Sequence, residues 1–327
     1  MGVWKTKVTE MLGIRYPIIE GGFGSFGTSV LAVPVSEAGG LGMITATALR
    51  TPEGLRQDIR LARSLTDKPF GVNLTLMGCP NIDEMCEVVI EEGVPVVETA
   101  ANRADKYGKR LQAAGAKWIH KVATVKHALA VEQQGADAVV IVGLEGAGFK
   151  STLQLPTLVS IPWAVKQLKI PVIAAGGIGD ARGFMAALAM GAEAVYLGTA
   201  FMATKECPIS ERHKQSMAEA DPTEPKYRER CLAPPKPEEL QRVMAERDSL
   251  PVDKWLLKLE RVMLKDSADV PDPTEIDLTE EAMEAELLRS LPGSLAVAVI
   301  DRVVSVRELI ENMISEAEEI RRRWSIC

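Results

Sequence analysis

Two short apolar runs near the middle of the chain end in residues that can bind an anion. One run ends at Gly176-Gly177 and the other at Gly198-Thr199. Glycine has no Cβ, so an anion can approach its backbone N–H closely. Two adjacent parallel strands with such ends would form a cup for a phosphate group. In eight-stranded α/β barrels, the loops after the last two strands are a frequent phosphate site.

Polar residues at the ends of other apolar runs suit a flat heteroaromatic ring. Asn73 and Thr75 alternate along one run, so both side chains point to the same face of a strand. Their amide and hydroxyl groups can reach ring carbonyls and ring nitrogens. Lys121 would place a positive charge near the ring edge, where a reduced flavin carries negative charge. The glycines at 21 and 22 let the backbone lie flat against such a ring.

Lys121 also leaves a second enzyme class open. A lysine at a strand end can form a Schiff base with a carbonyl substrate, and the phosphate cup would then hold a sugar phosphate. Trapping of Lys121 by borohydride would distinguish this barrel lyase from a flavin enzyme.

The elements that position these residues alternate between apolar runs and helix-period segments as far as about residue 203. The runs are continuous rather than alternating, which indicates strands buried on both faces of a parallel sheet. Gly135 and Gly191 each precede such a run, as helix-ending glycines do. The pattern predicts an α/β fold, a (β/α)8 TIM barrel, with an open doubly wound sheet as the alternative. The predicted strands are 16–22, 41–46, 69–76, 94–100, 117–122, 138–143, 171–177 and 194–201.

Beyond residue 203 the sequence becomes proline-rich and highly charged. The last segment restores helical periodicity, with apolar residues from Val306 to Ile320 on one face. We therefore expect a barrel formed by residues 1–203 and 298–327. Residues 204–297 would form a helical appendage, inserted before the last barrel helix, that acts as a lid over the barrel mouth.

Composition excludes several partners. The 327 residues carry 38 basic and 45 acidic side chains, a net charge of −7, which argues against nucleic acid. The five cysteines lack metal-site spacing and are typical of reduced thiols in the cytoplasm, so no metal is expected. No apolar run is long enough to span a membrane. The expected partners are a small-molecule substrate and a second copy of the chain, for which the charged appendage offers a surface.

The chain resembles the nitronate monooxygenase family, also called the 2-nitropropane dioxygenase-like FMN oxidoreductases. Within that family it is most similar to the NADH:quinone reductase branch, through Met1–Val3, Lys68–Thr75 and Lys205–Pro208. The segments that carry the family resemblance span the predicted barrel: Pro17–Gly22, Glu37–Gly42, Gly71–Leu74, Val96–Thr99, His120-Lys121, Ala174–Ile178 and Leu197–Thr199.

The resemblance implies tight, non-covalent FMN at the mouth of the barrel. NAD(P)H would reduce the FMN, which would pass electrons to O2, a quinone or another activated organic acceptor. Oxidation of alkyl nitronates by a nitronate monooxygenase proper is the alternative. By position, the phosphate would be held by Gly176, Gly177, Gly179, Gly198 and Thr199. The flavin would be lined by Gly21, Gly22, Phe23, Asn73, Thr75, Lys121 and Gly148.

One departure from the family pattern concerns the catalytic residues. The loop after the sixth strand ends in Gly-His in the family, and this His is the usual acid/base. Here the loop runs from Glu145 to Gly148-Phe149, and phenylalanine cannot transfer a proton. Lys121, Glu145 and Phe149, at the position of that His, are then the catalytic candidates. Hydride transfer and oxidation of anionic nitronates stay possible, whereas proton abstraction from neutral nitroalkanes is not expected.

The same departure motivates a third hypothesis, a flavin-binding barrel that has lost turnover. Slow or absent reduction of bound FMN by nicotinamide donors would support it. His120 does not replace the missing His, because strand alternation predicts that it points away from the barrel lumen as a packed structural residue.

Overall fold

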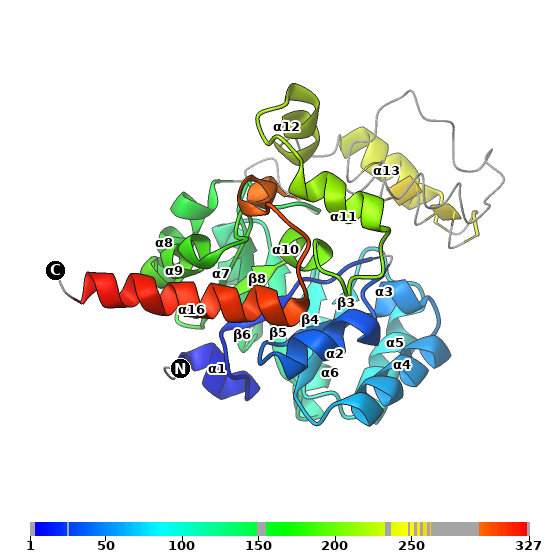
Figure 1. Ribbon diagram of the computed structural model, residues 1–327. Coiled ribbons are helices and arrows are strands. Elements are labelled where there is room, and N and C mark those ends of the chain that lie inside the picture. Colours follow the sequence, from blue (N-terminus) through cyan, green and yellow to red (C-terminus); the bar gives the residue numbers. More distant parts are fainter. Residues whose placement is uncertain are drawn as a thin grey trace.

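The computed structural model describes residues 4–24, 26–148, 155–232, 237–247, 249–251, 254–255, 258–259, 262 and 294–325, without the side chains of residues 226, 230 and 237. Strands and helices alternate along the first two thirds of the chain (Figure 1). The strands are β1 Ile18–Glu20, β2 Gly42–Thr45, β3 Phe70–Thr75, β4 Val96–Ala100, β5 Lys117–Val122, β6 Ala138–Val142, β7 Val172–Ala175 and β8 Ala194–Leu197. The helices are α1 Lys7–Leu12, α2 Ser29–Glu37, α3 Ala46–Leu49, α4 Pro52–Leu65, α5 Ile82–Glu91, α6 Asp105–Ala113, α7 Val125–Gln134, α8 Thr157–Gln167, α9 Ala181–Ala189, α10 Thr199–Met202, α11 Glu211–Ala218, α12 Pro225–Leu232, α13 Pro237–Ala245, the 3-10 helix η1 Leu295–Val299 and α16 Val306–Trp324.

The eight strands are parallel and form a nearly closed barrel. Hydrogen-bonded neighbours follow the order β1-β8-β7-β6-β5-β4-β3-β2. At the seam between β1 and β2, an isolated bridge joins Ile19 to Leu41. There the Glu20 carboxylate also accepts a hydrogen bond from the Met43 N–H at 2.9 Å. The predicted (β/α)8 barrel is therefore confirmed, and the open doubly wound sheet is wrong.

Local sequence signals set several element ends. The Thr51 hydroxyl accepts a hydrogen bond from Gly54 N at 3.1 Å, and a proline occupies the first turn of α4. Gly135 ends α7 with φ 95°, the left-handed conformation that glycine adopts most easily. The predicted eighth strand is too long, because the Gly198 carbonyl accepts hydrogen bonds from Phe201 and Met202 and starts α10.

The core has an inner and an outer layer. Alternate strand residues such as Ile119 and Val140 fill the lumen, and Val8 and Leu12 of α1 join this inner cluster. The other strand faces pack against the surrounding helices. The buried face of α16 includes Ile310 and Ile314, and the helix packs beside α9 and α2.

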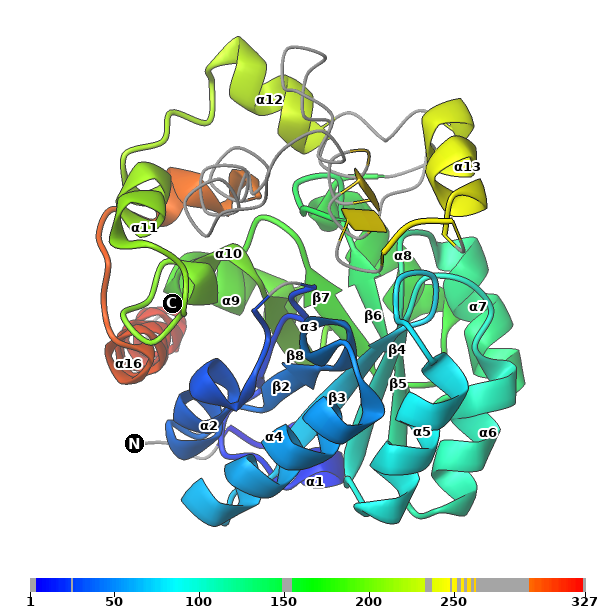
Figure 2. The same ribbon diagram turned by 90° about the vertical axis from the view of Figure 1, so that its right-hand side faces the viewer.

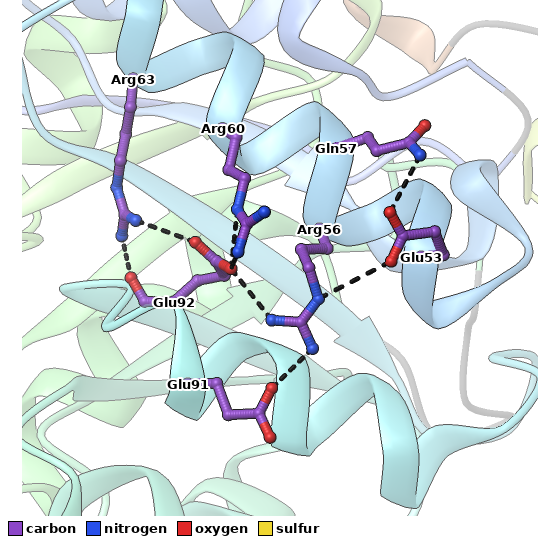
Figure 3. Close-up of polar contacts among 7 residues, drawn as sticks. All are labelled: Glu53, Arg56, Gln57, Arg60, Arg63, Glu91 and Glu92. Carbon is purple, nitrogen blue, oxygen red and sulfur yellow. Dashed lines mark hydrogen bonds and ion pairs between the residues drawn. The ribbon is translucent and has the colours of Figure 1, made fainter.

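An ion-pair cluster joins α4 to the end of α5 (Figure 3). Arg56, Arg60 and Arg63 each reach the carboxylate of Glu92, with N–O distances of 3.0, 2.9 and 3.2 Å. The Glu92 side chain is only 8% exposed. The cluster thus holds two neighbouring helices of the outer layer together.

The helices α11, α12 and α13 lie at the end of the barrel opposite α1 (Figure 2). Arg247, just after α13, donates a hydrogen bond to the carbonyl of Cys79 at 3.0 Å, in the loop after β3. The Tyr227 hydroxyl of α12 donates to the Ser294 carbonyl at 3.2 Å. Among the described residues, no helix has the length and apolarity needed to cross a membrane.

Candidate active site

The carboxyl ends of the strands carry a cluster of inward-facing polar side chains. On β3, Asn73 and Thr75 alternate with Val72 and Leu74, which belong to the outer layer. On β8, Tyr196 belongs to the lumen cluster. The apolar lumen layer therefore gives way to polar groups at one end of the barrel, where active sites of this fold lie.

Glu98 of β4 is the centre of this polar cluster. Its Oε2 accepts hydrogen bonds from the Asn73 amide nitrogen at 2.9 Å and from the Tyr196 hydroxyl at 2.5 Å. The Tyr196 hydroxyl in turn accepts from Gly22 N at 2.7 Å, and Asn73 Oδ1 accepts from the Thr75 hydroxyl at 2.8 Å. Burial, followed by the nearby Glu98 carboxylate, raises the pKa of Tyr196 well above its usual range. Five residues from four strand ends are thus linked in one hydrogen-bonded chain.

Lys121 completes the cluster from β5. Its ammonium nitrogen lies 5.2 Å from the centre of the Tyr196 ring, a cation–π distance. The side chain is half-buried. Lys121 therefore lies beside the predicted ring-binding residues Asn73 and Thr75, which share the polar cluster through Tyr196 and Glu98.

The ends of β7 and β8 present backbone groups as the sequence predicts. Gly176 and Gly177 have φ values of 103° and 72°, a region that L side chains rarely adopt. Within the described part of the chain, the N–H groups of Gly177 and Gly198 donate no hydrogen bond. A Cβ on Gly198 would meet no atom closer than 3.9 Å. These two N–H groups are thus free to bind an anion, which fits a phosphate group.

Thr199 is paired with the segment that precedes α16. Its hydroxyl donates to Ser294 Oγ at 2.9 Å and accepts from Ser294 N at 2.7 Å. Gly179 lies against the same segment, since a Cβ there would stand 3.3 Å from the Ala296 carbonyl oxygen. The start of η1 therefore lies next to the residues of the anion cup.

The glycines after β1 pack directly on the polar cluster. A Cβ on Gly22 would stand 2.8 Å from the Asn73 amide, and one on Gly21 would stand 3.3 Å from the Tyr196 ring. The N–H of Phe23 donates to the Thr45 hydroxyl at 2.9 Å, and its ring stacks on Phe26 at 4.8 Å. Only glycine allows this close approach of the β1 loop to β3 and β8.

Glu145 has a structural contact in the loop after β6. Its Oε2 accepts hydrogen bonds from the N–H and the hydroxyl of Thr157 at 2.8 and 2.9 Å. A carboxylate at this position stabilises the N-terminus of α8. Gly148 has φ 83°. Phe149 lies outside the described residues.

His120 points away from the lumen, as predicted. Its Nδ1 lies 2.7 Å from the Thr99 hydroxyl, and Trp118 Nε1 donates to the same hydroxyl at 2.7 Å. Burial, followed by the charges of His127 and Lys121, lowers the pKa of His120 from 6.5 to about 4. A neutral histidine in this outer layer has a packing role.

Sequence reasoning missed two residues of the site, Tyr196 and Glu98. The two-residue period of a strand could have found both, because each lies on the lumen face of its strand, and Glu98 also interrupts an apolar run. In the described part of the chain, no group of three or more His, Cys, Asp or Glu residues could hold a metal ion.

Sequence comparison identifies the family. A nitronate monooxygenase family profile matches residues 5–316. The chain belongs to the nitronate monooxygenase family. Members are oxidoreductases, and curated relatives carry names of this class. One is 37% identical over 220 residues, covering 66% of this chain and 61% of its own, and is named (3aS,4S,5R,7aS)-5-hydroxy-7a-methyl-1-oxo-octahydro-1H-indene-4-carboxyl-CoA dehydrogenase in Mycobacterium tuberculosis.

Other relatives support the same family. A probable nitronate monooxygenase from Staphylococcus saprophyticus is 32% identical over 263 residues, which cover 67% of this chain and 74% of that one. The match covers 74% of this relative but only 61% and 60% of the first two curated relatives. The chain thus spans less than two thirds of the length of those two proteins. The structure of FabK from Thermotoga maritima is 33% identical, with a TM-score of 0.77 and 98% coverage of both chains. Nitroalkane oxidase from Streptomyces ansochromogenes, at 24% identity and a TM-score of 0.72, shares the fold.

Proposed function

We propose that the protein is an FMN-dependent oxidoreductase that takes electrons from NAD(P)H and delivers them to O2, a quinone or another activated organic acceptor. Bound FMN would supply the hydride and electron chemistry. The observation that carries the proposal is the pair of free N–H groups of Gly177 and Gly198, beside a polar cluster at the same end of the barrel.

The residues around this cup have distinct roles in the proposal. Gly176, Gly177, Gly179, Gly198 and Thr199 would hold the phosphate of FMN through backbone N–H groups. The flavin ring is lined by Gly21, Gly22, Phe23, Asn73, Thr75, Lys121 and Gly148. Lys121 would stabilise negative charge on a reduced flavin ring and is the leading catalytic candidate. Glu145 shapes the loop after β6 by holding α8. Phe149, outside the described residues, stays a candidate because it occupies the position of the family's catalytic His.

Oxidation of alkyl nitronates is a second candidate. A nitronate is already an anion, so no residue has to abstract a proton from carbon, and Lys121 offers a positive charge at the mouth. Membership of an oxidoreductase family disfavours the Schiff-base lyase. Borohydride treatment with carbonyl substrates should therefore leave Lys121 unmodified.

We further propose that residues 1–203 and 298–327 form the barrel and that residues 204–297 act as a lid. The contacts of Arg247 with Cys79 and of Ser294 with Thr199 support this, because both bind the appendage to residues that follow strand ends. A cytoplasmic location is also proposed. It is supported by the buried cysteines Cys79, Cys86 and Cys207, which form no disulfide bond among the described residues.

The test is the visible absorption spectrum of the purified protein, followed without oxygen as NADH or NADPH is added. Flavin bands that bleach support the proposal. A protein that cannot be loaded with FMN contradicts the proposal. Flavin bands that do not bleach with either NADH or NADPH favour a flavin-binding barrel that has lost turnover.

Two lysines on the same strand provide a matched pair for this assay. Lys121→Met should slow flavin reduction, because the charge near the ring is lost. Lys117→Met removes a lysine from the far end of β5, where it is exposed, and should leave the rate unchanged. Equal rates in both variants would remove Lys121 from the proposed catalytic residues.

A further inference from the structure

The carboxylate of Glu98 is fully buried in the lumen, with an exposed fraction of 0%. Its Oε2 accepts two hydrogen bonds, whereas its Oε1 accepts none from the described residues. Burial of a carboxylate is costly, and an apolar residue would fill the lumen at a lower cost. The position of Glu98 therefore calls for a role beyond packing.

The hydrogen bonds around Glu98 can run in only one direction. The Gly22 N–H can only donate, so the Tyr196 oxygen accepts and its single proton is donated to Glu98. The Asn73 amide nitrogen can only donate as well, and it lies 2.9 Å from Glu98 Oε2, which therefore accepts from both sides. The Asn73 carbonyl oxygen then faces Thr75 and takes the one proton of its hydroxyl.

This direction determines what the half-buried Thr75 can offer a ligand. Because its proton is donated to Asn73, the Thr75 hydroxyl presents only lone pairs. Asn73 itself is only 1% exposed, so Thr75 is the member of the pair that faces a ligand. A hydroxyl that offers only lone pairs is complementary to a ring N–H, such as the one on the pyrimidine edge of a flavin.

We infer that Glu98 is a positioning residue that fixes the hydrogen-bonding direction of Asn73 and Thr75, so that the Thr75 hydroxyl at the mouth accepts from a ring edge that carries an N–H. Tyr196 acts with Glu98, because its hydroxyl accepts the hydrogen bond from the Gly22 N–H and donates its own proton to Glu98. This inference rests on the proposed flavin function and names the ring edge that the site recognises.

The test compares binding of FMN with binding of 3-methyl-FMN, in which the pyrimidine N–H is replaced by N–CH3. Affinities are measured by quenching of flavin fluorescence with the apoprotein. The wild type should prefer FMN by at least about tenfold, the effect of one buried hydrogen bond and a methyl clash. Glu98→Leu keeps the volume but removes the acceptor, so the preference should fall towards one.

Two variants separate positioning from packing. Glu98→Gln keeps one oxygen that can accept from Tyr196 and Asn73, and it should retain most of the preference. Glu20→Leu makes the same change at another glutamate with 0% exposure, outside this hydrogen-bonded chain, and should keep the wild-type preference. If Glu98→Leu does not fold, Thr75→Val is measured instead and should abolish the preference.

Two results would overturn the inference. One is a wild-type preference in Glu98→Leu or Thr75→Val, and the other is an equal loss in Glu20→Leu. Failure of the proposed function has a different signature, because the wild type would then take up no FMN at all. A wild type that binds FMN and 3-methyl-FMN equally would overturn only the role of Glu98.

Discussion

Burial of His120 predicts that the protein loses stability at mildly acidic pH. The Trp118 N–H donates to the Thr99 hydroxyl, which lies 2.7 Å from His120 Nδ1. Burial holds the imidazole in its neutral form. The His120 side chain is 3% exposed, so a charged ring would lack water.

The size of the effect follows from the two pKa values of His120, 6.5 without perturbation and about 4 in the folded protein. Between these values the unfolded chain binds a proton that the folded chain does not. The contribution is therefore fully present above pH 6.5 and is lost as the pH falls towards 4, by about 3 kcal/mol in total.

The assay is urea unfolding followed by tryptophan fluorescence between pH 7.5 and 4. His120→Gln can still hydrogen-bond to Thr99 but cannot titrate, so its free energy of unfolding should fall by about 3 kcal/mol less than that of the wild type. His127→Gln, at an exposed position, removes a charge that also lowers the pKa of His120, so its pH dependence should fall between those of the wild type and His120→Gln. A pH dependence that is the same in His120→Gln and the wild type would refute the reasoning.

Three further predictions concern the anion cup, the surface cluster and the loop after β6. Gly198→Ala adds a methyl group where the nearest atom is 3.9 Å away and φ is −99°, so the fold should persist while the Kd for FMN rises about tenfold or more. In the control Gly78→Ala, the added methyl group would lie at an ordinary contact distance of 3.5 Å from Leu259, so this variant should bind FMN normally. Equal affinities of Gly198→Ala and the wild type for FMN would exclude the cup as the phosphate site. Glu92→Gln should lower the free energy of unfolding by about 1 kcal/mol at low salt and by less in 1 M salt. Hydrogen bonds from Arg60, then Arg56, lower the pKa of Glu92, so the wild-type advantage is present above pH 4.5 and is lost as the pH falls below it. Phe149→His should raise turnover of neutral nitroalkanes by restoring a group that can take a proton; an unchanged rate in a variant that keeps its flavin would exclude this explanation.

Much of the site could be predicted from residue alternation along single strands. The inward direction of Asn73 and Thr75 and the outward direction of His120 follow from the two-residue period of a strand. The role of Glu145 did not follow in the same way. Its contact with Thr157 depends on how the loop after β6 returns to α8, which no local pattern encodes.

The sequence by itself determined the alternation of strands and helices, the parallel sheet and the glycine-bearing ends of β7 and β8. These features depend on local propensity and on burial of both strand faces. Only the tertiary structure decided the partners across the lumen. Tyr196 meets Glu98 because closure of the barrel brings β8 opposite β4, although the two residues are 98 positions apart. The direction of every hydrogen bond in that cluster depends on this closure, because a buried carboxylate acts only on the groups that the fold places around it.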